Sequence, residues 1–341
     1  MINPVLLNST QMARFASRGF LRLDAVVPEA INQQFLHDIR YEDDPDIGTP
    51  SKSKIRTASK SNKIRTPSKS KIEKIGTPRI HYQKVMQSSV IPVVKAGTPL
   101  DEAYPSGSAL KKLVDLPIVR GAIQSLVGSN PHLDHHFLHM TFPPRFYTES
   151  KTPQVSQNTH QDSTIDPRKA FDLQIMYFPH RVTKEMGGTR FIPGTHLRVV
   201  SEAAIGRYQN ILGQQHVVCE AGTLLLLHMG IWHGGGLNRS DDIRYMFKIR
   251  LCPRERQVRL WDDTDLPKDH FEQRPLFWTD EIPDPDHLHT ILTTPEPWFE
   301  ADTGRLEYLN RIRFWRYLLG DESFDADYWL TRVENEYDAA I

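Results

Sequence analysis

A histidine and an aspartate stand two residues apart at His160 and Asp162, and a second histidine follows at His233. In an extended chain, side chains two residues apart point to the same face, so His160 and Asp162 can approach one ion together. Two neutral imidazoles and one carboxylate bind Fe(II) on one face of an octahedron and leave three positions open. Non-haem oxygenases need that arrangement, because a chelating cosubstrate fills two positions and dioxygen the third. The spacing therefore predicts a metal site at these three residues.

A second His-x-Asp triplet, His132-Leu133-Asp134, shows how little the spacing means by itself. Chance produces such triplets in a chain with fifteen histidines. This one lies in an expected connection ahead of a strand, so we favour His160 and Asp162 as the ligands. The remaining alternative is that these histidines lie on the surface or form hydrogen bonds without binding a metal.

The segment 244–251 places its three basic residues on one face of an expected strand. Arg244 stands eleven residues after His233. A guanidinium there can receive the far carboxylate of 2-oxoglutarate as a bidentate pair, which predicts Arg244 as the cosubstrate anchor. Alternation alone leaves Lys248 and Arg250 as alternatives.

Short apolar or alternating runs separated by Gly, Pro, Asn and Asp predict strands in the middle third of the chain. The predicted strands span 137–142, 173–178, 217–219, 224–227 and 245–251. Such a series favours an antiparallel sandwich or barrel, and no glycine signature for nucleotide binding follows any strand. Gln174 shares a strand face with Asp172 and Met176, so we expect it to hydrogen-bond in the pocket. An ordinary interior amide is the alternative.

Helical spacing surrounds this middle third. Asn8 precedes a predicted amphipathic helix, a short strand follows at 19–23, and helical spacing resumes over 28–39. A further helical stretch at 110–127 is interrupted at Pro117. The spacing over 306–319 predicts a last helix that ends at Gly320. Five of the six tryptophans lie beyond residue 253, where we expect them to pack on the core, with an aromatic substrate lid as the alternative.

The chain carries 42 basic and 42 acidic residues, but the two signs are unevenly placed. Between Pro50 and Arg79 a short repeat of Ser, Lys and Ile holds ten basic residues and one acid, Glu73, which leaves the remainder with a charge of −9. This insertion, at 47–79, has too few apolar residues to offset the entropy of ordering, so we expect it to be disordered and inert. Nucleic-acid binding through its charge is the alternative, although no aromatic residues are interleaved to stack bases.

The remaining composition narrows the class of protein. No apolar run reaches the eighteen residues of a membrane span, so we expect no membrane association. The two cysteines, Cys219 and Cys252, cannot build a disulfide framework, which favours a reducing compartment, and we expect the cytoplasm.

Together these features resemble the phytanoyl-CoA dioxygenase family of Fe(II)- and 2-oxoglutarate-dependent oxygenases. The resemblance covers roughly residues 5–252 without the insertion, and it depends on the order and spacing of its elements rather than on any one of them. These elements are the segment 15–23, the His160-Gln161-Asp162 pair, Gly187-Gly188 leading to Ile192-Pro193-Gly194-Thr195-His196, and Gly222 through Trp232-His233 to Asn238 and Arg244.

The resemblance implies a double-stranded β-helix, a cupin-like jelly-roll whose mouth holds iron. It also implies that His160, Asp162 and His233 are the iron ligands and that Arg244 anchors 2-oxoglutarate. A carboxylate at position 162 argues against the related halogenases, which carry a small residue there.

Three departures from the family pattern affect the substrate assignment. Phe178 can take the aromatic position near 2-oxoglutarate, but Gly235 stands where a serine is common in the family. The insertion interrupts a region that can contribute cosubstrate contacts. The tryptophan-bearing tail has no counterpart in the family pattern.

We therefore predict a mainly β fold with flanking helices. A jelly-roll domain spans 1–252, and an aromatic-rich extension at 253–341 packs on it. The predicted activity is a dioxygenase that uses Fe(II), 2-oxoglutarate and dioxygen to hydroxylate a small organic molecule, with release of succinate and CO2. No catalytic residue beyond the metal centre is expected. The alternatives are a jelly-roll that binds a metal or ligand without catalysis, and a nucleic-acid-associated protein acting through the insertion.

Overall fold

A computed structural model of the chain describes residues 3–39, 91–163, 165, 170–198, 205, 210–255, 260–266, 284–298 and 301–320. The predicted insertion at 47–79 lies outside these residues. So do two of the tail tryptophans, Trp278 and Trp329.

The larger sheet is antiparallel and has six strands in the order β1-β7-β4-β9-β3-β2. In chain order these are β1 (Phe20–Leu23), β2 (Thr98–Pro99), β3 (His132–Thr141), β4 (Leu173–Phe178), β7 (Thr223–His228) and β9 (Arg244–Cys252). The central strands β4 and β7 are buried along their whole length, because helices cover one face and the second sheet lies toward the other.

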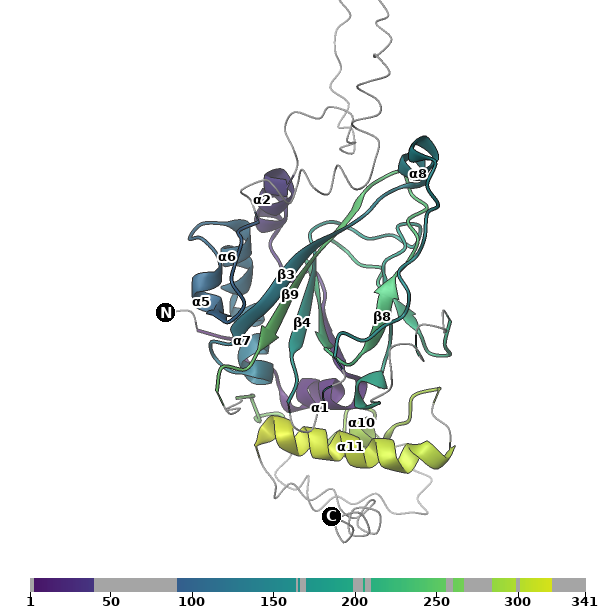
Figure 1. Cartoon of the computed structure of the whole chain (residues 1–341). Coiled ribbons are helices and arrows are strands. Elements are labelled where there is room, and N and C mark those ends of the chain that lie inside the picture. The colour runs from purple at the N-terminus through teal and green to yellow at the C-terminus, as the bar shows by residue number, and fades with distance from the viewer. Residues whose placement is uncertain are drawn as a thin grey trace, which may run out of the picture.

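A smaller antiparallel sheet runs in the order β6-β5-β8, with β5 (Thr189–Ile192), β6 (Gln215–His216) and β8 (Trp232–Gly235). Figure 1 shows β8 standing apart from β3, β9 and β4 of the larger sheet. The predicted fold, a mainly β protein with a jelly-roll core and flanking helices, is confirmed.

Helices flank this core on two sides (Figure 1). One group lies beside the larger sheet and consists of α2 (Glu29–Ile39), α5 (Leu100–Ala103), α6 (Ala109–Val114) and α7 (Pro117–Val127). At the base lie α1 (Ser9–Arg18), α10 (Leu288–Thr293) and α11 (Ala301–Leu319). The short α8 (Pro144–Ser150) follows β3, and the 3-10 turn η1 (Thr195–Leu197) follows β5.

The helix ends follow the predicted signals. The Asn8 side chain accepts a hydrogen bond from the backbone N–H of Gln11, and the Gln11 side chain accepts one from the backbone N–H of Asn8, which satisfies two amides at the start of α1. The helix ends at Gly19, whose φ of 74° is readily adopted only by glycine. The predicted break at Pro117 is present, since α6 ends at Val114 and α7 begins at Pro117, whose missing N–H costs nothing at a first helical position.

Strand alternation divides the larger sheet into two apolar clusters. Tyr177 and Phe247 point toward the helices and pack on Phe35, with ring centroids 5.4 and 5.5 Å from it. Met176 and Met246 point the other way, into the space between the sheets. Each fully buried side chain of this size stabilises the fold by about 1.5–3 kcal/mol.

Several strands differ from the sequence expectations. Strand β3 begins at His132, so the triplet His132-Leu133-Asp134 lies inside a strand and not in a connection. Strands β5 and β8 were not predicted, because each has only four residues, too few to show an apolar period. The predicted strand at 217–219 is replaced by β6 at 215–216 and an isolated bridge between Val182 and Cys219.

The described part of the C-terminal extension packs on α1. Trp261 Nε1 donates to Ser9 Oγ at 2.9 Å, and Arg18 forms an ion pair with Glu296 at 3.1 Å. Trp315 in α11 is fully buried. These contacts agree with packing on the core, and the domain boundary at 252 stays a prediction.

Among the described residues, the helices are all too short or too polar to pass through a lipid bilayer.

Two neutral histidines lie in the core at the base of the barrel. Nε2 of His196 bonds the carbonyl oxygen of Ala16 at 2.9 Å, and Nδ1 of His228 accepts the N–H of Gly230 at 2.9 Å. Burial lowers the pKa of His196 from 6.5 to about 3 and lowers the pKa of His228 well below 6.5. Both imidazoles therefore stay uncharged in the folded protein at neutral pH.

We predict that the metal-free protein loses stability as the pH falls below 6.5. Between pH 6.5 and 3 the unfolded chain binds a proton at His196 that the folded chain does not. The free energy of unfolding therefore falls by about 1.4 kcal/mol for each unit by which the pH is lowered. His196→Gln, which keeps a hydrogen-bond donor, should give a slope shallower by about that amount in denaturant titrations between pH 6 and 4. His37→Gln, which removes an exposed histidine, is the comparison variant. An unaltered slope in His196→Gln would contradict the prediction.

Candidate metal and cosubstrate site

His160, Asp162 and His233 converge at one point, as predicted. One ligand atom from each lies within 4.8 Å of the others. Nε2 of His160 lies 3.6 Å from Asp162 Oδ1, and Nε2 of His233 lies 3.9 Å from Asp162 Oδ2. Two imidazole nitrogens and a carboxylate at these separations form a donor set that suits a divalent transition metal.

The backbone brings the two histidines together. His160 and His233 exchange both backbone hydrogen bonds, at 2.9 and 2.8 Å, in an isolated antiparallel bridge. Nδ1 of each ring lies 2.9 Å from a carbonyl oxygen two residues earlier, that of Asn158 for His160 and that of Ile231 for His233. With Nδ1 protonated to make these bonds, Nε2 carries the lone pair and is free to ligate a metal.

Gly234 allows this bridge to form. A Cβ at this position would lie 2.9 Å from the carbonyl oxygen of Asn158 and 3.0 Å from that of Gln157. Gly234 thus lets the strand that carries His233 lie close against the segment that carries His160.

The charges of His233 and Asp162 at neutral pH suit the binding of a cation. Burial lowers the pKa of His233 to about 4, so this imidazole is neutral. Burial raises the pKa of Asp162, but His233, Lys248 and His160 outweigh it and bring that pKa to about 2. The carboxylate is therefore ionised, and a metal need not displace a proton from either group.

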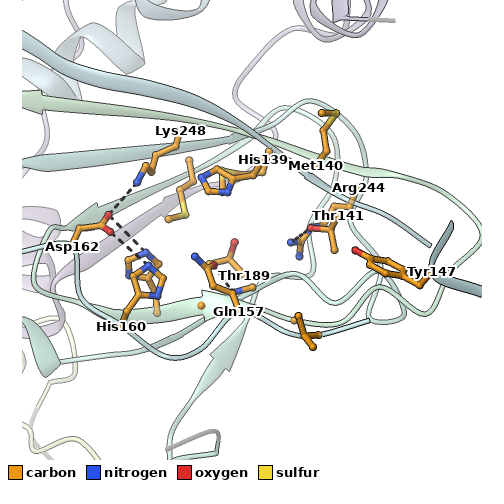
Figure 2. A pocket seen from close by; sticks show the side chains of 17 residues that line it. His139, Met140, Thr141, Tyr147, Gln157, His160, Asp162, Thr189, Arg244 and Lys248 are labelled. Carbon is orange, nitrogen blue, oxygen red and sulfur yellow. Dashed lines mark hydrogen bonds and ion pairs between the residues drawn. The ribbon is translucent and has the colours of Figure 1, made fainter. Parts of the chain in front are cut away.

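The three ligands line one end of a cavity of about 350 Å³ between the two sheets. Figure 2 shows His160 and Asp162 at one end and Arg244 with Thr141 toward the other. The lining comprises His139, Met140, Thr141, Tyr147, Val155, Gln157, His160, Asp162, Met176, Thr189, His233, Gly234, Gly235, Gly236, Arg244, Met246 and Lys248. Its volume lies in the range of small-molecule sites.

Arg244, the predicted anchor, is 3% exposed and lines this cavity. Its Nη2 donates to Thr141 Oγ1 at 2.7 Å, and its Nη1 donates to the carbonyl oxygen of Gly187. Nε is buried and has no hydrogen-bond partner among the described residues. Burial lowers the pKa of Arg244 to about 10, which still leaves the guanidinium charged at neutral pH.

The two alternatives to Arg244 have different surroundings. Lys248 lines the cavity, and its Nζ lies 3.2 Å from Asp162 Oδ2. Arg250 is not a lining residue, and it pairs with Asp172 at 2.6 Å and with Asp134 at 3.6 Å. The structure therefore brings Arg244 and Lys248 to the cavity wall, whereas Arg250 pairs with Asp172 and Asp134 and donates from Nη1 to the carbonyl oxygen of Asp162 at 3.5 Å.

Gln174 and Phe178 share the strand face of Met176, as alternation requires, but neither is a lining residue. Gln174 lies opposite Arg250 in the sheet, and its amide atoms are buried without a hydrogen-bond partner among the residues that the structure describes. Phe178 lies in the apolar cluster around Met176. The structure does not bring these two side chains to the cavity, and their predicted contact with the cosubstrate stays a prediction.

Sequence reasoning missed several lining residues, among them His139 and Thr141. Both lie on β3 opposite β9, where His139 pairs with Met246 and Thr141 with Arg244. Burial and nearby positive charge lower the pKa of His139 to about 3, and its Nε2 has no hydrogen-bond partner in the described part of the chain. The predicted strand at 137–142 already contained both residues. Only the register between β3 and β9 shows which face of that strand meets the cavity.

Comparison with known proteins bears on the identity of this site. The model of the phytanoyl-CoA dioxygenase family matches residues 15–246, more than half of the chain. Two curated relatives, the uncharacterized proteins Rv1501 of Mycobacterium tuberculosis and Mb1539 of Mycobacterium bovis, are each 31% identical over 135 residues. The match covers 38% of this chain and 46% of each relative, so the chain matches less than half of their length.

Solved structures that resemble this chain in fold include two proteins of low sequence identity. The non-haem α-ketoglutarate-dependent carbocyclase SnoK from nogalamycin biosynthesis is 16% identical, with a TM-score of 0.43, over 73% of this chain and 87% of that one. HygX from Streptomyces hygroscopicus with iron bound is 12% identical, with a TM-score of 0.43, over 73% and 88%.

The close approach at Gly234 gives a testable consequence. We predict that Gly234→Ala destabilises the protein by about 1–3 kcal/mol, because the new methyl group meets two backbone carbonyls that must move. It should also weaken binding of Fe(II), measured by anaerobic titration, because His160 follows those carbonyls directly. Gly235→Ala is the matched control, since its Cβ would lie 3.5 Å or more from its neighbours. Equal behaviour of the two variants would show that the approach is not a constraint.

Proposed function

Because the chain belongs to the phytanoyl-CoA dioxygenase family, whose members are Fe(II)- and 2-oxoglutarate-dependent oxygenases, we propose that it hydroxylates a small organic molecule at the cavity between its two sheets. The observation that carries the proposal is the placement of three metal ligands and a buried arginine in one cavity.

The donor set fits Fe(II). Both histidines present Nε2, because their Nδ1 atoms are held by main-chain carbonyls, and Asp162 supplies an ionised carboxylate. Residues His160, Asp162 and His233 would hold the metal and leave one side of it open to the cavity. Iron with 2-oxoglutarate and dioxygen supplies the oxidising chemistry, with loss of CO2 and formation of succinate.

Arg244 fits the far carboxylate of 2-oxoglutarate. Its buried Nε is a donor without a partner, and a buried unpaired donor is costly unless a ligand satisfies it. Thr141 Oγ1 holds the same guanidinium from the neighbouring strand and so fixes its orientation. A charged, planar donor in a water-poor site suits a carboxylate better than a neutral group would.

The rest of the cavity would bind the substrate and exclude water. Met176 and Met246 line it from the larger sheet, and Tyr147 lines it from α8. Thioether side chains adapt to irregular apolar ligands, and the tyrosine adds an aromatic wall with a polar tip. A substrate with both an apolar body and polar groups agrees with this lining.

Addition of Fe(II) and 2-oxoglutarate under anaerobic conditions should produce a visible metal-to-ligand charge-transfer band. His160→Ala and His233→Ala should each abolish the band, because two of the three ligands no longer define a facial site. His132→Ala, at the other His-x-Asp triplet, is the control and should keep the band. The proposal fails if the wild-type protein gives no band, or if the band survives in both ligand variants.

Arg244→Met should raise the dissociation constant for 2-oxoglutarate by roughly 10- to 100-fold, the loss expected for hydrogen bonds to a charged group. The affinity for Fe(II) alone should stay unchanged, because Arg244 is not a ligand. Arg250→Met serves as the comparison and should affect cosubstrate affinity less. Normal 2-oxoglutarate binding by the Arg244 variant would move the anchor to Lys248 or Arg250.

A further inference from the structure

The three metal ligands are oriented by different kinds of partner. Both imidazoles are held by main-chain carbonyl oxygens, which no side-chain substitution removes. The backbone N–H of Asp162 donates to the carbonyl of Met229 at 3.1 Å, which places the residue but not its carboxylate. Lys248 is the side chain that holds the carboxylate, by a hydrogen bond of 3.2 Å to Oδ2.

Lys248 is set rigidly enough for this role. It lies in the middle of β9, paired with Phe137 of β3 on one side and Met176 of β4 on the other. The residue is 9% exposed, and its side chain reaches across the cavity toward Asp162 (Figure 2). Its Nζ lies closer to the carboxylate than Nε2 of either histidine does.

We propose that Lys248 is a positioning residue that keeps Asp162 a ligand through one oxygen only. By engaging Oδ2, it leaves Oδ1, which lies 3.6 Å from Nε2 of His160, for the metal. An ammonium group has donors and no acceptor, so it can hold a carboxylate without competing as a ligand. The inference rests on the proposed function, because its consequence concerns the cosubstrate.

Single-oxygen ligation matters because the number of open positions is small. Two histidines and one carboxylate oxygen occupy three of six octahedral positions. A carboxylate that used both oxygens would take a fourth and leave too few for a bidentate 2-oxo acid and dioxygen. Removing a side chain that orients a metal ligand typically lowers metal affinity or activity by about 10- to 100-fold.

The competing interpretation is that Lys248 binds the far carboxylate of 2-oxoglutarate itself. The two interpretations differ in which part of the cosubstrate should respond to a substitution. A positioning role acts on the 2-oxo acid group that binds the metal, whereas direct binding acts on the far carboxylate. 2-Oxobutyrate, which has the 2-oxo acid group and no far carboxylate, separates them.

The experiment compares Lys248→Met with wild type at saturating Fe(II) under anaerobic conditions. We expect the dissociation constants for 2-oxoglutarate and 2-oxobutyrate to rise by the same factor, about tenfold or more. We also expect the charge-transfer band to shift in position at saturation, since the carboxylate environment of the metal has changed. Lys248→Arg, which keeps a cationic donor, should restore the affinities and the band. Arg244→Met should show the opposite pattern, with a loss confined to 2-oxoglutarate.

Other results would overturn either the positioning role of Lys248 or the proposed function. Loss of 2-oxoglutarate affinity alone in Lys248→Met would assign Lys248 to the far carboxylate and overturn the positioning role. Unchanged affinities and band would overturn it as well. A wild-type protein that gives no band with either acid would overturn the proposed function, whereas a wild-type band that Lys248→Met leaves intact overturns only this inference. Lys248→Gln is a second substitution that removes the ammonium group, for use if Lys248→Met does not fold. The midpoint of thermal unfolding of each metal-free variant shows whether it has folded.

Discussion

The site depends on one pair of backbone hydrogen bonds, those exchanged between His160 and His233. These two bonds join a segment outside the main strands to β8, across 73 positions of the chain. They hold both imidazoles side by side, with ring centroids 4.4 Å apart. Gly234 is required for the approach, because any side chain there would meet the carbonyls of the neighbouring segment. The geometry of the ligands is therefore a property of the main chain.

Strand alternation supplies the rest of the cavity. On β9 the odd-numbered residues face the helices, with Phe247 and Leu251 fully buried, while Arg244 and Lys248 face the space between the sheets. The same strand thus contributes to the apolar core on one side and to a charged cavity on the other. A shift of one residue in its register would bury the charges and expose the core, so the packing of the core fixes the chemistry of the site.

Burial and neighbouring charge set the protonation states of His233, His139 and Asp162 in the cavity. Burial keeps His233 and His139 neutral, whereas Asp162 stays ionised because positive groups face it. The cavity carries two cations, Arg244 and Lys248, against one carboxylate. That surplus suits a dianionic cosubstrate beside a divalent metal. The acidic balance of the chain outside the insertion has no bearing on this local charge.

The sequence by itself predicted the candidate ligands, the basic strand face that holds the candidate anchor, and the class of fold. Residue type and spacing within one strand or one short motif are local properties, so His160 with Asp162 and the face shared by Arg244 and Lys248 were predictable. The tertiary structure decided which candidates meet. It excluded the His132 triplet from the ligand cluster, engaged Arg250 with Asp172, kept Gln174 and Phe178 from the cavity wall, and added His139 and Thr141. Those outcomes depend on the register between strands far apart in the chain, and that register is set by the packing of the whole core.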